Sequence, residues 1–181
     1  MAYLITCAGS KNKPLDFNPS TLDQLSNNNI LLQSRQLMID LTGVHLDWNH
    51  TLPAWQLYRG TRSKIYPQIS EQNWNKSCVE IKILSALFGW INHMDLIPYY
   101  DLRMTDRRGV ANQQIWRIWY NMKILSVIVN PNDIDLLSQD YRKAITGKKR
   151  PVGIVPPNVC FNDYGIKKGK WLNNELNNLT C

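Results

Sequence analysis

Near its start the chain contains Tyr3-Leu4-Ile5-Thr6-Cys7-Ala8-Gly9-Ser10-Lys11, and this stretch decides the fold class. Residues 3–7 are apolar or β-branched, as in a buried strand, and the glycine with its polar neighbours indicates a tight loop. Residues 78–89 form a second apolar run that ends at a glycine, as a central strand and its exit loop do. Residues 135–137 and 153–155 have the composition of further strands. Because helical segments separate these runs, we expect an α/β protein.

Helical periodicity is clearest in residues 31–41, where apolar positions recur at helical spacing up to Gly43. Further helices are indicated at residues 53–58, 112–120, 141–145 and 171–179. Residues 125–129 fit either a strand or a continuation of the helix before them. Since 181 residues can bury one substantial core, we expect a single domain over residues 1–181.

The composition is that of an ordinary globular protein, since 44% of the residues are hydrophobic and 19% are charged. No apolar run approaches the roughly 20 residues that span a bilayer, and residues 1–11 lack the pattern of a signal peptide. We therefore expect a cytoplasmic protein without a membrane partner. The four cysteines lack the C-x-x-C spacing of a zinc or redox centre and are expected to be reduced. They are Cys7, Cys78, Cys160 and Cys181.

Positive charge is concentrated toward the end of the sequence. Residues 141–181 contain eight Lys or Arg residues against Asp163 and Glu175, so they carry nearly all of the net charge of +7. Such a basic face is typical of polyanion binding, because each cation near a phosphate releases condensed counterions. A basic surface that serves only solubility is the alternative. The residues expected to contact DNA are Arg59, Arg62, Lys64, Arg103, Arg107, Arg108, Lys148, Lys149, Arg150, Lys167 and Lys168.

The turn that follows the first strand has the residues of a phosphate-binding loop. Gly9 lets backbone N–H groups approach an anion, and Ser10 and Lys11 add side-chain donors. An ordinary tight turn explains the same residues. The patterns G-x-x-x-x-G-K-[ST] and G-x-G-x-x-G are absent, so the turn does not predict nucleotide hydrolysis or dinucleotide binding.

Several enzyme classes lack sequence support. His45, His50 and His93 lie in no H-E-x-x-H or other metal-ligand spacing, and no G-x-S-x-G motif is present. The H-x-E and P-C-x-x-C signature of zinc base deaminases is also missing. We therefore expect neither a metal site nor a cofactor, and carboxylate chemistry is what the remaining residues allow.

Asp101 is the favoured catalytic carboxylate, because residues 97–104 form a loop in which a carboxylate can be partly desolvated. Such a group could stabilise an oxocarbenium-like sugar and activate water during N-glycosidic cleavage. The structural alternative is a loop aspartate that pairs with Arg103. Glu80 is the next carboxylate, although its spacing from Lys82 indicates a charge pair on one face of a strand.

Four short motifs follow one another along the chain. They are C-x-G-S-K at residues 7–11, P-A-W-Q-L-Y-x-G at 53–60, L-S-A-L-F-G at 84–89 and I-x-Y-x-D-x-x-M at 97–104. Their order resembles that of the YaaA-like group, over most of residues 1–145. The resemblance implies a three-layer α/β sandwich with a central, mostly parallel sheet, similar to uracil-DNA glycosylase, and it implies DNA as the partner.

The resemblance also implies positions for substrate binding. Tyr99 and Tyr100 could stack on an extruded base, or they could belong to the core. The expected substrate-binding residues are Cys7, Gly9, Ser10, Lys11, Ser85, Gly89, Tyr99, Tyr100 and Met104. Two hallmarks of uracil-DNA glycosylase, a G-Q-D-P-Y-like loop and an H-P-S-like loop, are absent, so enzymatic roles do not transfer directly.

Three functions stay open at this point. The chain also resembles small bacterial antiphage glycosylases that remove glucosylated hydroxymethylcytosine from T-even phage DNA, which implies a DNA glycosylase acting on modified phage DNA. The second possibility is a non-catalytic DNA-binding stress protein of the YaaA-like group. The third is an enzyme of nucleoside or sugar transfer that uses the turn at residues 9–11 for phosphate. No obligate protein partner is inferred.

Overall fold

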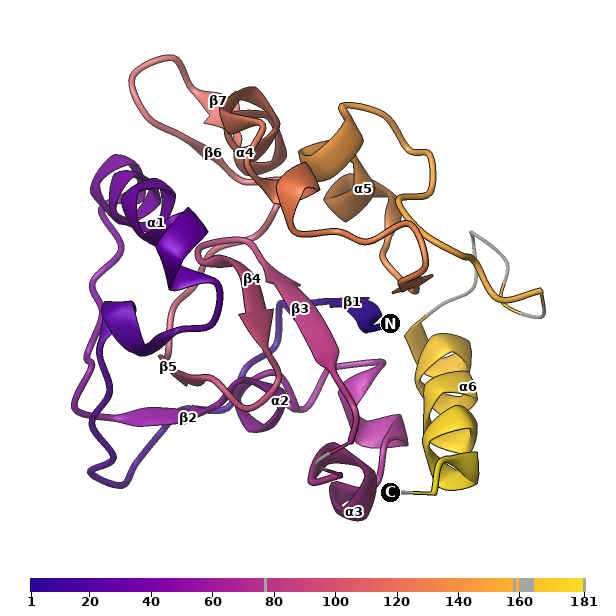
Figure 1. The fold of residues 1–181 in the computed structure, drawn as a ribbon. Coiled ribbons are helices and arrows are strands. Elements are labelled where there is room, and N and C mark those ends of the chain that lie inside the picture. Colours follow the sequence, from indigo (N-terminus) through magenta and orange to yellow (C-terminus); the bar gives the residue numbers. More distant parts are fainter. Residues whose placement is uncertain (77, 158, 160–164, 181) are drawn as a thin grey trace.

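A four-stranded sheet forms the centre of the computed structural model, which describes residues 1–76, 78–157, 159 and 165–180. The strand order is β4-β3-β1-β8 (Figure 1). β1 (Tyr3–Thr6) lies between β3 (Ile81–Ser85) and β8 (Ile134–Asp135) and runs parallel to both, whereas β4 (Gly89–Asn92) runs antiparallel to β3. The predicted α/β fold with a mostly parallel sheet is confirmed.

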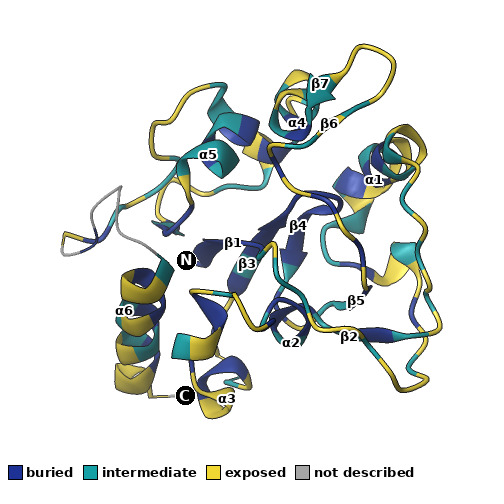
Figure 2. Cartoon of the chain, turned by 180° about the vertical axis from the view of Figure 1, so that it is seen from behind, coloured by how far each residue is buried: buried dark blue, intermediate teal, exposed yellow. Residues whose placement is uncertain are grey.

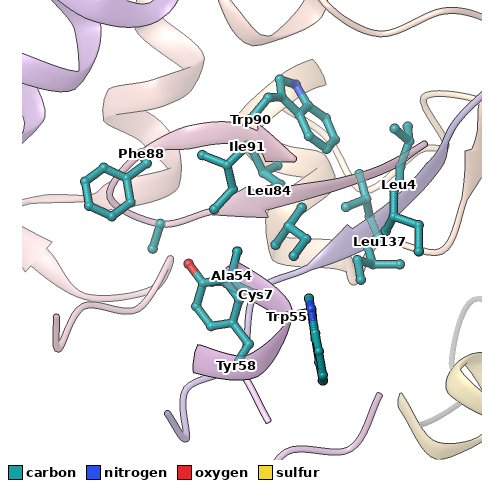
Figure 3. Close-up of a cluster of buried hydrophobic side chains, with 14 of the residues drawn as sticks. Leu4, Cys7, Ala54, Trp55, Tyr58, Leu84, Phe88, Trp90, Ile91 and Leu137 are labelled. Carbon is teal, nitrogen blue, oxygen red and sulfur yellow. The ribbon is translucent and has the colours of Figure 1, made fainter. Parts of the chain in front are cut away.

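The two central strands are buried on both faces, which explains their continuous apolar sequences. The register places Tyr3 opposite Ile81 and Ile5 opposite Ile83. Every residue of β1 is buried, and Leu4 and Ile5 are completely inaccessible. Figure 3 shows Trp90 of β4 on one side of the sheet and Trp55 on the other. Two apolar layers therefore hold the sheet.

Helices lie on both sides of this sheet (Figure 1), and the dark buried residues of the sheet lie between their exposed outer faces (Figure 2). The α-helices are α1 (Asn28–Thr42), α2 (Ala54–Leu57), α3 (Glu71–Trp74), α4 (Ile115–Met122), α5 (Gln139–Thr146) and α6 (Gly165–Asn178). The 3₁₀ turns are η1 (Leu22–Gln24), η2 (Tyr66–Gln68) and η3 (Leu125–Val127). Two small antiparallel pairs complete the described elements, β2 (Thr51–Pro53) with β5 (Leu96–Pro98) and β6 (Arg107–Arg108) with β7 (Gln113–Gln114).

Most predicted elements are confirmed, and a few differ in extent. α1 ends where predicted, because Gly43 adopts a left-handed φ of 61° and its N–H bonds to the carbonyl of Ile39. Residues 125–129 contain neither a strand nor a continued α-helix, but the single turn η3. Residues 153–155 contribute only one bridge, between Ile134 and Ile154. The terminal helix begins at Gly165, six residues before the predicted start.

Aromatic side chains fasten the helices to the sheet by hydrogen bonds as well as by packing. The Trp90 indole N–H donates to the carbonyl of Leu125, and that of Trp119 donates to the carbonyl of Ala86. Because buried indole groups need such partners, these bonds fix η3 and α4 against the edge of β3 and β4. The tryptophans of this side therefore belong to the core and not to a binding surface.

The cysteines are only partly as predicted. Cys7 is a free, buried thiol, as expected of a reduced cysteine. Cys78 is disulfide-bonded, so the prediction that it is reduced is wrong. Cys160 and Cys181 lie outside the described residues. Within the described part of the chain, no helix has the length and apolar character needed to cross a membrane.

Candidate functional site

The strands that follow β1 in the sequence lie on opposite sides of it in the sheet. β3 is the neighbour of β1 on one side, and β8, which comes later in the chain, is its neighbour on the other. In open α/β sheets, ligands bind at the carboxyl ends of the strands where the order divides in this way. Two cavities lie at this point, and both are lined by residues 6–9 and by Ser138. We call the two cavities together the crevice.

The first lobe of the crevice is a basic cavity of about 240 Å³. Arg62 and Lys64 come from the loop after α2, and their side chains are exposed. Opposite them, Gly165 and Lys168 come from the first turn of α6. Lys168 is only 4% exposed, and its Nζ donates to the carbonyl of Leu137 at 2.9 Å. Cationic side chains and a helix amino terminus therefore surround one cavity.

The second lobe, of about 300 Å³, has a more varied lining. Leu102, Met104 and the exposed Arg103 form one wall, and Asp140 and Tyr141 of α5 form the other. The Tyr141 hydroxyl lies 2.9 Å from the Cys7 thiol. Burial raises the pKa of Tyr141 well above its ordinary value, so this hydroxyl is a neutral hydrogen-bonding group.

Residues 9–11 form the loop between the lobes, and residues 60–62 pack against this loop. A Cβ atom at Gly60 would lie 2.6 Å from the backbone nitrogen of Lys11, so no larger residue fits there. The Ser10 hydroxyl accepts the N–H of Arg62 at 3.1 Å. A Cβ at Gly9 would come within 3.7 Å of the Arg103 Nε, so Arg103 lies across the loop. These contacts place the basic residues of both walls at the end of β1.

Lys11 is an unusual member of this loop, because its ammonium is buried without a hydrogen-bond partner. It lies 4.4 Å from the centroid of the Tyr100 ring, which provides a cation–π contact. Burial lowers the pKa of Lys11, while Cys7 and the carboxylates of Asp101 and Asp106 act in the opposite direction. The side chain lines neither lobe.

Behind the loop, three hydroxyl groups form a buried chain. The Tyr58 and Tyr100 hydroxyls are 2.6 Å apart, and the Ser85 hydroxyl is 2.8 Å from that of Tyr100. Ser85 also accepts the N–H groups of Leu87 and Phe88. Tyr100 is 1% exposed, so its predicted role as a stacking surface is wrong and its core alternative holds. The same bonds make Ser85 a part of the fold rather than of the crevice lining.

The other residues predicted to bind substrate have mixed positions. Met104 lines the second lobe. Gly89 adopts a φ of 66° and packs against the Trp119 ring, so it serves the β3–β4 turn. Tyr99 is 36% exposed, with the Lys13 ammonium 5.5 Å from its ring centroid. Of the residues predicted to bind substrate, Cys7, Gly9 and Met104 line the crevice.

Asp101 occupies a different environment from the expected one. Asp101 is exposed to solvent, and it lines neither lobe of the crevice. The expectation of a partly desolvated carboxylate is therefore not met. The Glu80 Oε1 atom lies 3.5 Å from the Lys82 Nζ atom, which confirms the predicted charge pair. Among the described residues, Asp140 is the carboxylate that lines the crevice, and sequence reasoning missed it.

The cations predicted to bind DNA divide into two groups. Four of them line the crevice, namely Arg62, Lys64, Arg103 and Lys168, although Lys168 is buried and not on an exposed face. The others lie outside the crevice lining: Arg59, Arg107, Arg108, Lys148, Lys149, Arg150 and Lys167. Arg59 forms an ion pair with Glu71 at 3.2 Å.

A buried ion pair connects β8 to α5, the helix that forms one wall of the second lobe. Asp135, at the end of β8, receives the Arg142 Nε at 2.9 Å, and both side chains are almost completely buried. Asp135 also accepts the N–H groups of Leu137 and Val152. The pair ties the end of β8 to α5 and so positions Ser138 at the amino end of that helix, where its side chain makes no capping bond. Across the described ranges, no three His, Cys, Asp or Glu residues form a group that could hold a metal ion.

Comparison with known proteins finds one family. The profile of the family described as "Peroxide stress protein YaaA" matches residues 3–171. This range includes β1, the linings of both lobes and the first half of α6. A search of curated proteins found no match.

Proposed function

Since the chain belongs to the peroxide stress protein YaaA family, we propose that it is a DNA-binding protein that holds the phosphate backbone along the crevice. The observation that carries the proposal is that exposed cations line both lobes of the crevice. Arg62 and Lys64 lie on the first lobe and Arg103 lies on the second. Cations spaced along a groove suit a linear polyanion, because each phosphate they neutralise releases counterions.

Helix geometry supports the same proposal. α5 begins next to Ser138, and α6 begins at Gly165; both residues line the crevice. The positive dipole ends of helices favour anions. Two helix amino ends next to the cationic walls therefore add to the attraction for phosphate.

Binding can be tested by fluorescence anisotropy with a labelled duplex at several salt concentrations. We expect Arg103→Gln to weaken binding of all sequences by about fivefold, since a phosphate contact carries no sequence information. Lys13→Gln is the matched control, because Lys13 is exposed and lies outside the crevice lining. Duplex binding that does not respond to salt, or no binding at all, would contradict the proposal.

DNA glycosylase activity is a second candidate, favoured by the lining of the second lobe. Leu102 and Met104 provide apolar surface, Tyr141 provides a hydroxyl and Asp140 a carboxylate. An extruded base needs such a mixed pocket, and a carboxylate can stabilise the oxocarbenium-like sugar while donors take up charge on the leaving base. Under this proposal the substrate is modified phage DNA, and the fold relationship is to uracil-DNA glycosylase.

The glycosylase candidate predicts a product. Incubation with DNA that contains glucosylated hydroxymethylcytosine, in the presence of a chelator, should release free modified base and leave alkali-labile sites. Asp140→Asn should keep DNA binding and lose most turnover, because the amide retains the shape of the carboxylate that lines the second lobe but not its charge. Asp101→Asn is the comparison, because Asp101 is exposed and lines neither lobe. Turnover that is kept in Asp140→Asn and lost in Asp101→Asn would move the catalytic role to Asp101. Tight binding without either product would leave DNA binding alone.

A further inference from the structure

The β6–β7 hairpin projects from the body of the molecule, and its loop is exposed (Figures 1 and 2). Arg107 and Arg108 pair with Gln114 and Gln113. The loop is closed by a bond of 3.0 Å from the N–H of Asn112 to the carbonyl of Gly109, and both of these residues have a left-handed φ. This geometry defines a tight four-residue loop with Val110 in it.

Val110 is the most exposed of the large hydrophobic residues in the described part of the chain, with a relative exposure of 108%. Single exposed apolar residues are common and need no explanation. Val110 differs because two arginines precede it in the same hairpin. The Arg107 Nη1 donates to the carbonyl of Asn112, and the Arg108 Nη1 donates to that of Arg107. These bonds hold both guanidinium groups close to the loop that presents Val110.

The base of the hairpin is attached to the wall of the crevice. The N–H of Trp116 donates to the carbonyl of Met104 at 3.0 Å, and the N–H of Ile115 donates to that of Asp106 at 2.9 Å. The Gln114 side chain reaches the carbonyl of Thr105. Because Met104 and Thr105 line the second lobe, the hairpin and the crevice wall are one bonded unit.

We propose that this hairpin is a wedge that enters a groove of duplex DNA and places Val110 between adjacent base pairs. The inference rests on the proposed function of DNA binding. Arg107 and Arg108 would lie against the flanking phosphates, and the apolar tip would replace stacking contacts of a displaced base. Asp106, at the base of the hairpin, accepts the N–H of Arg103 through its carboxylate. The two arginines therefore favour an anionic partner such as DNA over a basic or neutral protein surface.

A wedge next to the crevice would lower the energetic cost of moving a nucleotide out of the base stack. Extrusion of a nucleotide costs the stacking and pairing of its base, and an inserted apolar side chain compensates part of that loss. The hairpin would open the base stack, and the second lobe of the crevice would receive the displaced nucleotide. Binding and local unstacking are thus two separable properties of the same complex.

The test uses duplex DNA that contains 2-aminopurine, whose fluorescence rises when it is unstacked, together with anisotropy for affinity. We expect the wild-type protein to raise the fluorescence. Val110→Ser should abolish the increase and weaken binding about fivefold, because the apolar contact with the bases is lost. Val110→Leu should retain both. Val127→Ser is the matched control, since Val127 is an exposed valine (67%) outside the hairpin.

The outcomes separate the wedge from the proposed function. Duplex binding with no increase in fluorescence for the wild type would overturn the wedge and leave DNA binding in place. The same would follow if Val110→Ser and Val127→Ser behaved alike. Absence of duplex binding by the wild type would overturn the proposed function itself. A fluorescence increase lost in Val110→Ser and kept in Val110→Leu would support the wedge.

Discussion

Replacement of Arg62, Lys64 and Arg103 by glutamine offers the most direct measure of how the crevice meets DNA. The three cations are exposed and line the two lobes. Glutamine keeps a polar but shorter side chain and removes the charge. If the crevice holds the backbone, each of these side chains faces one phosphate.

The size of the effect follows from counterion release. For duplex DNA, the logarithm of the binding constant falls with the logarithm of salt concentration by about 0.9 for each phosphate neutralised. Loss of Arg62, Lys64 and Arg103 should therefore reduce the magnitude of the slope by about 2.7. Each single variant should reduce it by about 0.9. Lys168→Met should change it less, because the Lys168 ammonium already donates to the carbonyl of Leu137.

The slope is measured by anisotropy titrations of one duplex over a series of salt concentrations. Thermal unfolding checks that the variants are folded, and exposed substitutions of this kind should change stability by less than about 0.5 kcal/mol. An unchanged slope in the triple variant would refute the assignment of phosphate contacts to the crevice. An equal loss in Lys13→Gln would show that the effect reflects net charge alone.

Three further outcomes are expected. Neutralisation of the exposed turn at Lys148, Lys149 and Arg150 should weaken DNA binding at all sequences and flatten its salt dependence, and an unchanged slope would remove this turn from the interface. Asp135→Asn should lower the free energy of unfolding by about 3–5 kcal/mol in denaturant titrations, because it leaves Arg142 charged and buried; Asp140→Asn, which breaks a more exposed pair with Lys143, should cost under about 1 kcal/mol. Lys11→Met should raise stability at neutral pH by about 1 kcal/mol, since the buried ammonium lacks a hydrogen-bond partner. Burial lowers the pKa of Lys11 in the folded protein below its ordinary value of 10.5. Between the folded-state pKa and 10.5 the unfolded chain therefore binds more protons than the folded protein. Wild-type stability should rise with pH in this window, while the stability of the Lys11→Met variant should not.

The parts of the fold that sequence predicts well are those with a local signal. β1 and α1 carry an apolar run and a helical period, and each is followed by a glycine turn. β4 was missed, because Gly89-Trp90-Ile91-Asn92 is too short to show a period and continues an apolar run. Residues 153–155 have the composition of a strand but meet the sheet at one bridge only, since the chain there passes the edge of β8.

The crevice is less predictable, because its two walls come from distant parts of the chain. Cys7 and Tyr141 are separated by 134 positions, and no local pattern joins them. The C-x-G-S-K motif did identify the loop between the lobes. It did not show that the Lys11 side chain lies against the Tyr100 ring instead of lining the crevice, because Tyr100 lies 89 positions further along the chain.

Adjacent residues in the 99–101 segment show why residue type alone misassigns roles. The sequence offers Tyr99, Tyr100 and Asp101 as one aromatic and acidic loop, yet only Tyr100 turns inward. Its hydroxyl bonds to Tyr58 and Ser85 supply the partners that a buried phenol requires. The residues on either side of it, Tyr99 and Asp101, are exposed.

The unequal lining of the crevice constrains how a nucleotide would bind under the proposed function. A phosphate in the second lobe would meet the carboxylate of Asp140, whereas the first lobe offers Arg62, Lys64 and the amino end of α6. Like charges at contact distance repel, and desolvation in a cavity strengthens the repulsion. The favourable orientation of a nucleotide in the crevice therefore has its own phosphate in the first lobe and its sugar and base across residues 7–9 in the second, while Arg103, beside Gly9, faces the phosphate of a neighbouring nucleotide. That orientation brings the base against Met104, on the wall that carries the β6–β7 hairpin.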